Sequence, residues 1–332
     1  MEPTVHHVSC LDHYVSWMNK LLGSRLNIAC GEDGTVGRLV TKSTAALLFL
    51  VLIWGVSWPI YKSSVAYAPP LLFSGMRALL GGCLVALFIF RMRKKLKWRK
   101  NWPKYCISAF FNTILFFGLH TMGLNHLPGG LFSVLVYFQP VLLGIFAWIW
   151  LGENMSFIKV MGLVTGFIGI IVVSLDGLTT HISVVGVVLG LLTALFWTLG
   201  VIYVKKVSHE VDAYWMVAMQ FAIGGMVFLI AGSFTESWSA IEWNGMYLFG
   251  LIFGGTVGIP VAYVVYYSLI NAGEASKVGV FTFLVPVISV FISTFFLGEP
   301  LTYKLVAGLV LVVISIYFVN YRKPLNKKQS LP

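Results

Sequence analysis

Apolar residues dominate long stretches of the chain, and short polar segments separate these stretches. An apolar run of about 20 residues is long enough for an α-helix to cross the hydrocarbon core of a bilayer. Because the polar segments are short, they leave no room for a folded catalytic domain outside the membrane. The pattern predicts ten membrane-spanning helices, at about residues 43–62, 70–90, 103–123, 129–150, 157–175, 184–204, 214–234, 245–270, 275–297 and 303–321.

Composition supports this interpretation. Of the 332 residues, 58% are hydrophobic and only 11% are charged. A soluble domain carries about 25% charged residues. A chain with so much apolar surface needs lipid around it, so the predicted fold class is an all-α polytopic membrane protein in a lipid bilayer.

Positive charge is concentrated in one polar segment. The formal net charge is +11, and the segment RMRKKLKWRKNWPK at 91–104 alone contributes eight Lys or Arg residues. By the positive-inside rule this segment lies in the cytoplasm. An even number of spans then places both ends of the membrane region in the cytoplasm, together with the basic tail at 322–332. Because the positive charge is concentrated at one face of the membrane, it indicates the orientation of the protein and does not predict a nucleic-acid partner.

The first 40 residues form a tail outside the membrane. They contain no uninterrupted apolar core, so they are not a secretory signal peptide. The sequence VTKSTAALLFL, which begins at Val40, is typical of a transporter N-terminus whose GTG start codon is translated here as Val. We therefore expect that residues 1–40 are not part of the working protein. Four potential metal ligands in the tail match no tight metal-binding template, and no metal or cofactor is expected: His6, His7, Cys10 and His13.

The two halves of the membrane region repeat each other. The segment QPVLLGIFAWIWLGENMSFIKVMGLV at 139–164 aligns with VPVISVFISTFFLGEPLTYKLVAGLV at 285–310, an offset of 146 residues. Earlier in each half, MRALLGG aligns with MQFAIGG, and Trp54 aligns with Trp197, at an offset of 143. Two colinear blocks of this length indicate an internal duplication.

The duplication predicts two five-helix repeats, at 43–176 and 183–321. Because five is odd, the second repeat enters the membrane in the opposite sense to the first. The charge pattern supports the inversion, since the counterpart of the basic segment is the acidic segment at 235–244. Inverted repeats are a recurring architecture of secondary transporters, with the substrate near mid-membrane at the repeat interface.

Several motifs resemble those of a known family. The first span contains LIWGVSWPIYK, the second contains PPLLFSGMR, and both halves contain a proline-to-LGE block. In this order the motifs resemble the EamA-type transporters of the drug/metabolite transporter superfamily, over residues 43–321. The resemblance implies ten helices, cytoplasmic termini, and movement of small metabolites, often export of amino acids or their derivatives. We accordingly expect a multi-pass protein of the cell membrane, specifically a bacterial inner membrane.

Prolines within the spans mark candidate solute-lining helices. A proline inside a membrane helix frees a backbone carbonyl, which is tolerated where the helix lines a protein interior or a watery cavity. Such prolines occur in both halves, as a site at the repeat interface requires. The alternative is that they only shape helix packing. The four are Pro59, Pro140, Pro260 and Pro286.

Aromatic and polar residues occur at similar depth on these spans. Trp54 and Trp58, four residues apart, share one face of the first helix. Together such side chains would suit an amphipathic solute, although any one aromatic here could equally serve packing or face lipid. The candidate solute-binding residues of this group are Trp54, Trp58, Gln139, Trp197, Tyr263, Tyr267 and Phe283.

Two ionisable residues complete the candidate site. Arg77 lies roughly 10 Å inside the outer end of the second span. It could bind a substrate carboxylate, or it could hold loose backbone carbonyls as a structural clamp. His120 lies at a similar height in the third span, where it could accept a proton or act as a hydrogen-bonded packing residue.

No Asp or Glu lies within any predicted span. The small multidrug-resistance branch of the superfamily uses a glutamate in its first span to bind cations and protons, so that type of antiporter is disfavoured. The sequence favours a secondary transporter, specifically an exporter, that moves a neutral, zwitterionic or anionic metabolite by alternating access. A non-transporting sensor or scaffold is the main alternative. A membrane-embedded lipid-modifying enzyme is disfavoured, because no catalytic cluster accompanies the spans.

Two further patterns carry structural expectations. Each LGE motif ends one helix with Gly and places Glu close to the start of the next, where its charge complements the helix dipole. Glu153 should lie on the cytoplasmic side and Glu299 on the external side, and a gating ion pair stays open as an alternative role. Glycine pairs four residues apart at 162–166 and 186–190 predict close helix packing, within one chain or between the chains of a homodimer.

Overall fold

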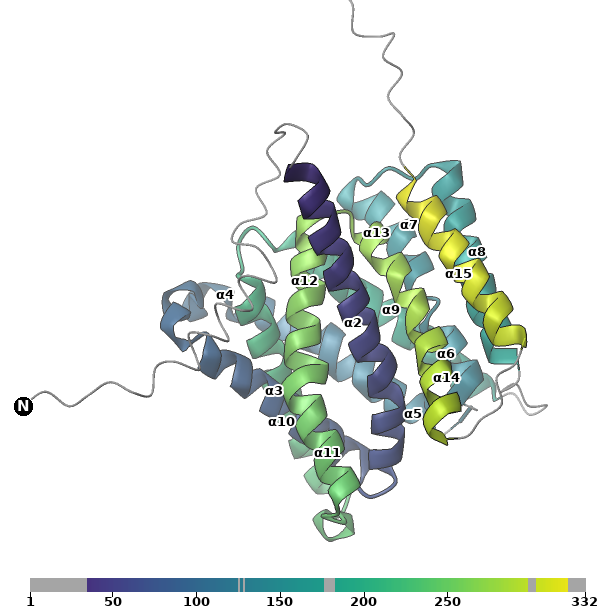
Figure 1. Cartoon of the computed structure of the whole chain (residues 1–332). Helices are drawn as coiled ribbons and strands as arrows, with labels where there is room; N and C mark the ends of the chain where they lie inside the picture. Colours follow the sequence, from purple (N-terminus) through teal and green to yellow (C-terminus); the bar gives the residue numbers. More distant parts are fainter. Residues whose placement is uncertain (1–34, 125, 128, 176–182, 298–302, 322–332) are drawn as a thin grey trace, which may run out of the picture.

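The computed structural model describes residues 35–124, 126–127, 129–175, 183–297 and 303–321. All regular secondary structure in these residues is helical. Helix α2 begins, and α15 ends, at the same end of the bundle, at the top of Figure 1. Residues 1–34, which include the histidines and Cys10 of the tail, lie outside the described residues, as do the basic tail at 322–332 and Glu299.

The first half of the chain forms five successive helical segments. Two of them are not uniform α-helices: the third contains a π-helical turn, and the fourth is interrupted. The elements are α2 (Thr35–Val65), α3 (Pro70–Phe88), the 3-10 helix η1 (Phe90–Lys95), α4 (Trp98–Ala109), the π-helix η2 (Phe110–Leu115), α5 (Phe116–Leu124), α6 (Gly129–Val136), α7 (Gln139–Leu151) and α8 (Phe157–Ser174).

The second half follows the same order. A π-helical turn again interrupts its third segment, and its fourth segment again changes helix type before a proline. The elements are α9 (Val184–Lys206), α10 (Ala213–Thr235), the 3-10 helix η4 (Trp238–Ala240), α11 (Gly245–Phe253), the π-helix η5 (Gly254–Val261), α12 (Ala262–Ala272), α13 (Ala275–Gly279), the 3-10 helix η6 (Val280–Phe283), α14 (Leu284–Leu297) and α15 (Tyr303–Asn320).

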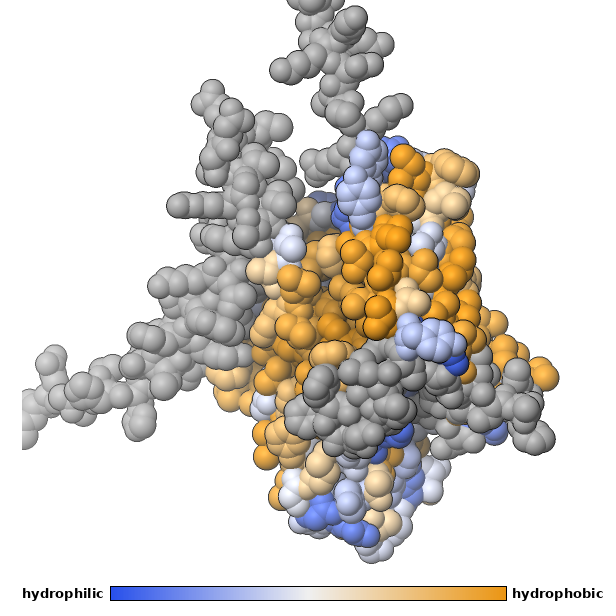
Figure 2. Space-filling view, turned by 45° about the vertical axis from the view of Figure 1, so that its right-hand side comes forward, coloured by the Kyte–Doolittle hydropathy of each residue, from blue (hydrophilic) through white to orange (hydrophobic). Residues whose placement is uncertain are grey.

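The helices are suited to a membrane. Among the described residues, seven helical segments are long and apolar enough to cross a bilayer, and three shorter apolar helices cover 157–173, 275–289 and 306–320. Figure 2 shows hydrophobic side chains over the middle of one face, with hydrophilic ones near its top and bottom. Large apolar side chains such as Leu87, Phe157 and Val184 are exposed, which lipid contact explains. The protein is therefore a polytopic membrane protein.

Corresponding helices of the two halves pack against each other. Helix α3 crosses α10 and α8 lies along α15, while α2 packs on α14 and its counterpart α9 packs on α7. Glycines allow the closest approach: a Cβ atom added to Gly225 would lie 2.5 Å from the backbone nitrogen of Leu79. The predicted small-residue pairs act within the chain. Gly162 and Gly166 face α15, Gly190 faces α6, and Gly186 faces Leu127 in the connection before α6.

The prolines act in different ways. Residues Tyr137 and Phe138 separate α6 from α7 just before Pro140, and η6 precedes Pro286. Pro260 lies inside η5, whereas α2 continues through Pro59 as one helix. The π-helix η2 contains no proline, so proline position does not predict it.

Candidate solute-binding site

Trp54 lies at the centre of an aromatic cluster between the two halves. Its ring centroid lies 5.9 Å from that of Trp197 on α9. The centroids of Tyr263 and Tyr266 on α12 lie 5.6 and 5.1 Å away. All four rings are buried. The cluster therefore joins a helix of the first half to two helices of the second.

A second group of rings continues from this cluster along α2. The indole nitrogen of Trp58 donates a hydrogen bond of 3.1 Å to the Tyr137 hydroxyl, at the break between α6 and α7. His120 on α5 lies with its ring centroid 4.9 Å from that of Trp58. Phe116, one turn earlier on α5, contacts Trp197 at 5.0 Å and thereby links this group to the first.

A polar network lies beside the rings. The Gln220 side-chain oxygen on α10 accepts hydrogen bonds from the Tyr267 hydroxyl (3.0 Å) and the Ser108 hydroxyl (2.5 Å). Asn112 in turn donates to Ser108 at 3.3 Å. All four residues are buried. Sequence reasoning named Tyr267 as a solute contact, whereas the structure shows its hydroxyl engaged in this internal network.

Arg77 lies inside a cage of rings. Only 7% of the residue is exposed. The guanidinium carbon lies 4.1 Å from the Tyr61 ring centroid, and 5.3 Å from those of Phe73 and Phe117. Its Nε and Nη1 atoms are buried and donate no hydrogen bond to any described residue. The described residues therefore give no support to the structural clamp, in which carbonyl groups would accept these hydrogen bonds.

Other buried polar atoms near Trp54 also lack partners. In the described part of the chain, both amide atoms of Gln139, the Trp197 indole nitrogen and the Tyr266 hydroxyl have no hydrogen-bond partner. Buried polar atoms are nearly always hydrogen-bonded, to protein or to ordered molecules such as water. These atoms thus mark places where water or a solute would complete the hydrogen bonding.

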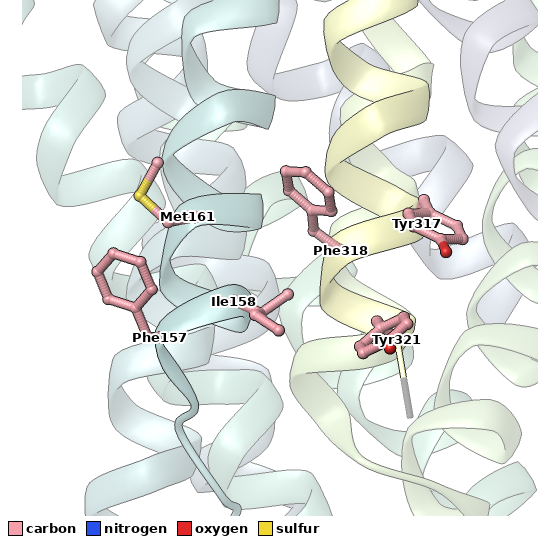
Figure 3. Close-up of a pocket in the computed structure, with 6 residues that line it drawn as sticks. All are labelled: Phe157, Ile158, Met161, Tyr317, Phe318 and Tyr321. Atoms are coloured by element: carbon pink, nitrogen blue, oxygen red, sulfur yellow. The ribbon is translucent and has the colours of Figure 1, made fainter. Parts of the chain in front are cut away.

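Phe283 lies apart from the cluster. None of the ring pairs among the described residues includes it, and its ring instead packs against α8 at Gly166. The hollow shown in Figure 3 is also separate: it lies at the surface between α8 and α15 and measures about 300 Å³. Six residues line this hollow, none of them a predicted site residue: Phe157, Ile158, Met161, Tyr317, Phe318 and Tyr321.

An ion-pair network joins the two halves at the end where α7 ends. The Glu153 carboxylate accepts hydrogen bonds from the backbone nitrogens of Ala275 (2.5 Å) and Ser276 (3.3 Å), and from the Ser276 hydroxyl. The Nζ atom of Lys159 lies 3.5 Å from the same carboxylate and 3.0 Å from that of Glu274.

This geometry corrects the expectation for Glu153. The carboxylate caps α13 of the second half, and Ser156 caps the following helix α8 by accepting from the Lys159 backbone nitrogen at 3.2 Å. The reason is the left-handed backbone at Gly152 (φ 69°), which ends α7 and turns the chain. Glu153 therefore reaches across to α13 of the second half and also pairs with Lys159 in the first turn of α8, within its own hairpin.

Glu274 and Lys205 extend the network. Partial burial by itself raises the pKa of Glu274, but hydrogen bonds from Lys277 (2.5 Å) and Lys159 outweigh it, so the pKa is lowered. Lys205 at the end of α9 donates to the Ile270 carbonyl at 2.6 Å and to the Gly273 carbonyl. Two lysines thus tie the end of α12 and the start of α13 to other helices.

Some central residues were missed by sequence reasoning. Tyr137, Tyr266 and Phe116 contact the predicted tryptophans. Gln220 accepts hydrogen bonds from Tyr267 and Ser108, and the sequence carries no local signal for this role. Among the described residues, no three His, Cys, Asp or Glu side chains lie close enough together to hold a metal ion.

Comparison with known proteins decides the family. The model of the EamA-like transporter family matches the chain twice, at residues 42–175 and 184–321. The chain belongs to the EamA-like transporter family. A duplicated EamA segment agrees with the helices of the two halves, which follow the same order and pack as counterparts.

Relatives of this EamA-family protein are named transporters. "Uncharacterized transporter YvbV" of Bacillus subtilis (strain 168) is 48% identical over 291 residues, which cover 88% of this chain and 95% of the relative. The "Probable amino-acid metabolite efflux pump" of Escherichia coli (strain K12) is 25% identical, over 83% of this chain and 94% of the pump. The chain is thus similar to membrane transporters along most of its length.

A solved crystal structure shares the fold. It superposes with a TM-score of 0.73 and covers 84% of this chain and 97% of its own. The two sequences are only 16% identical, so this likeness shows the fold and nothing finer.

Proposed function

We propose that this EamA-family protein is a secondary transporter that exports a small neutral, zwitterionic or anionic metabolite, such as an amino acid or a derivative. The observation that carries the proposal is the buried cluster between the two halves, in which aromatic rings lie beside polar atoms without partners. Apolar faces and unpaired polar atoms together suit an amphipathic solute. The efflux pump among the relatives supports this class of substrate.

The proposed architecture has ten transmembrane helices as two inverted repeats, at 43–176 and 183–321, with both ends in the cytoplasm. Seven long apolar helices and three shorter ones among the described residues support this number. Contacts of α3 with α10 and of α8 with α15 support a two-fold relation between the repeats, because counterparts that meet lie near its axis. Residues 1–40 form the dispensable tail, and 322–332 form the basic cytoplasmic tail.

Alternating access follows from this architecture. The repeats rock about the shared cluster, so that the solute-binding site opens first to one side of the membrane and then to the other. The network of Glu153, Lys159 and Glu274 crosses the repeat interface at the end assigned to the cytoplasm. We assign this network as the cytoplasmic closure, which separates when the repeats open inward.

The membrane and the assembly are also proposals. We place the protein in the inner membrane of a bacterium. The hydrophobic side chains over the middle of the face in Figure 2 suit a membrane, and the relatives from B. subtilis and E. coli are bacterial proteins. A homodimer would use surfaces other than the predicted glycine pairs, because those glycines pack inside the chain.

Flux measurements test the transport function. Purified protein is screened for thermal stabilisation by amino acids, their derivatives and nucleosides, and each stabilising solute is then followed in proteoliposomes. We expect saturable flux of at least one of them, absent from protein-free liposomes. Binding without flux would instead identify a sensor or scaffold, and chemical conversion of a lipid or solute would identify an enzyme.

A further inference from the structure

Arg77 has a buried charge that the chain does not neutralise. None of the described helices contains an Asp or Glu, and the Asp and Glu residues of the described part lie in the segments between helices. A buried guanidinium without a counter-charge is costly, and buried charges in membrane proteins are normally paired. The described helices therefore offer no carboxylate that could pair with Arg77.

The surroundings orient the guanidinium without satisfying it. Tyr61 stacks on its face, and Phe73 and Phe117 stand at equal distances around it. Cation–π contacts offset part of the desolvation but use none of the N–H groups. The unpartnered Nε and Nη1 belong to the two edges through which a guanidinium makes paired hydrogen bonds to a carboxylate.

The cage is continuous with the aromatic cluster. Phe117 contacts Phe221 at 6.3 Å, Phe221 contacts Tyr263 at 4.7 Å, and Tyr263 contacts Trp54. An unbroken series of ring contacts therefore connects Arg77 to Trp54. Among the described cations, Arg77 is the one that these cage rings surround. One buried positive charge matches one negative charge on the solute.

We infer that Arg77 binds the carboxylate of the transported solute, so that the substrates are monocarboxylates with an apolar or aromatic part. This inference rests on the proposed transport function and narrows its substrate class. It excludes the amides and esters of the same solutes, which cannot supply the negative charge.

Matched acid and amide probes test the assignment. The purified full-length chain is titrated calorimetrically with N-acetyl-L-phenylalanine and L-phenylalanine, and with the amide of each. We expect at least one acid to bind about tenfold or more tightly than its amide, the size expected for hydrogen bonds to a charged group. Arg77→Gln should remove that preference, and Arg77→Lys should retain part of it, because the charge remains while the paired donors are lost.

Controls keep the result interpretable. Arg93→Gln removes an exposed cation outside the site and should leave the acid preference unchanged. If Arg77→Gln does not fold, the ratio of acid affinity to amide affinity is compared between the native chain and Arg77→Lys, and this comparison tests the assignment. Equal affinity for acid and amide, no binding of either acid, or full acid preference in folded Arg77→Gln overturns the carboxylate assignment. Flux of a neutral solute in that case would still leave the transport function standing.

Discussion

Trp54 and Trp197 are counterparts in the two repeats, and their rings touch. The sequence alignment predicted the positions of both tryptophans, but it did not predict the residues that contact them. Tyr137 lies in the break between α6 and α7, and Tyr266 lies on α12, directly after the π-helix η5. Local sequence specifies neither contact.

Gln220 is a residue whose removal should cost stability. Gln220→Leu would leave the hydroxyls of Ser108 and Tyr267 without their shared acceptor, at a cost of about 1–3 kcal/mol. We expect a lower melting temperature of the purified protein in detergent, measured by intrinsic fluorescence. Gln139→Leu is the matched control, since neither of its amide atoms has a partner in the described structure, and it should melt near the native temperature. Equal melting of both variants would contradict the network.

At the scale of elements, the crossing of α3 and α10 depends on glycine. A Cβ at Gly225 would collide with the α3 backbone, so Gly225→Ala must push the helices apart, at a cost of about 1–3 kcal/mol. A lower melting temperature in detergent should report this cost. Gly245→Ala is the matched control, because nothing lies within 4 Å of a Cβ at that position. A Gly225→Ala protein as stable as the control would show that the helices are not this close.

Glu274 should make stability depend on acidity. Its folded-state pKa is lowered from the ordinary 4.5, so its contribution is present above about that pH and is lost as the pH falls further. We expect the melting temperature of the native chain to fall between about pH 5 and about pH 3 more than that of Glu274→Gln. Exposed Glu242→Gln should behave like the native chain. Parallel pH profiles of all three proteins would contradict the role of Glu274.

The elements themselves were largely predictable from the sequence. Apolar run length and proline position were enough to predict most helices and the break before Pro140. The π-helical turn η2 was not predictable, because its cause lies in packing: Asn112 and Thr113 face the glycines Gly200 and Gly224 of other helices. The role of Glu153 was likewise hidden, since its partner helix lies 122 residues away in sequence.

At the scale of the whole molecule, cysteine labelling can test whether the two repeats are inverted relative to each other. In a chain whose four cysteines are replaced by serine, single cysteines are placed at Ser239 and Lys94, both exposed. A membrane-impermeant maleimide added to intact cells should label Ser239→Cys, and should label Lys94→Cys only after permeabilisation. Labelling of both from the same side would contradict the inverted arrangement, because the two segments are counterparts.

The most direct test of the account is solute counterflow in proteoliposomes, with the solute that stabilises the purified protein most. Trp54→Ala and Trp197→Ala should each lower the initial rate at subsaturating solute by about tenfold, because each removes a ring from the shared cluster. Trp148→Ala, which removes a ring that is 54% exposed, should transport like the native protein. Native rates in folded Trp54→Ala and Trp197→Ala would contradict a solute site between the two repeats.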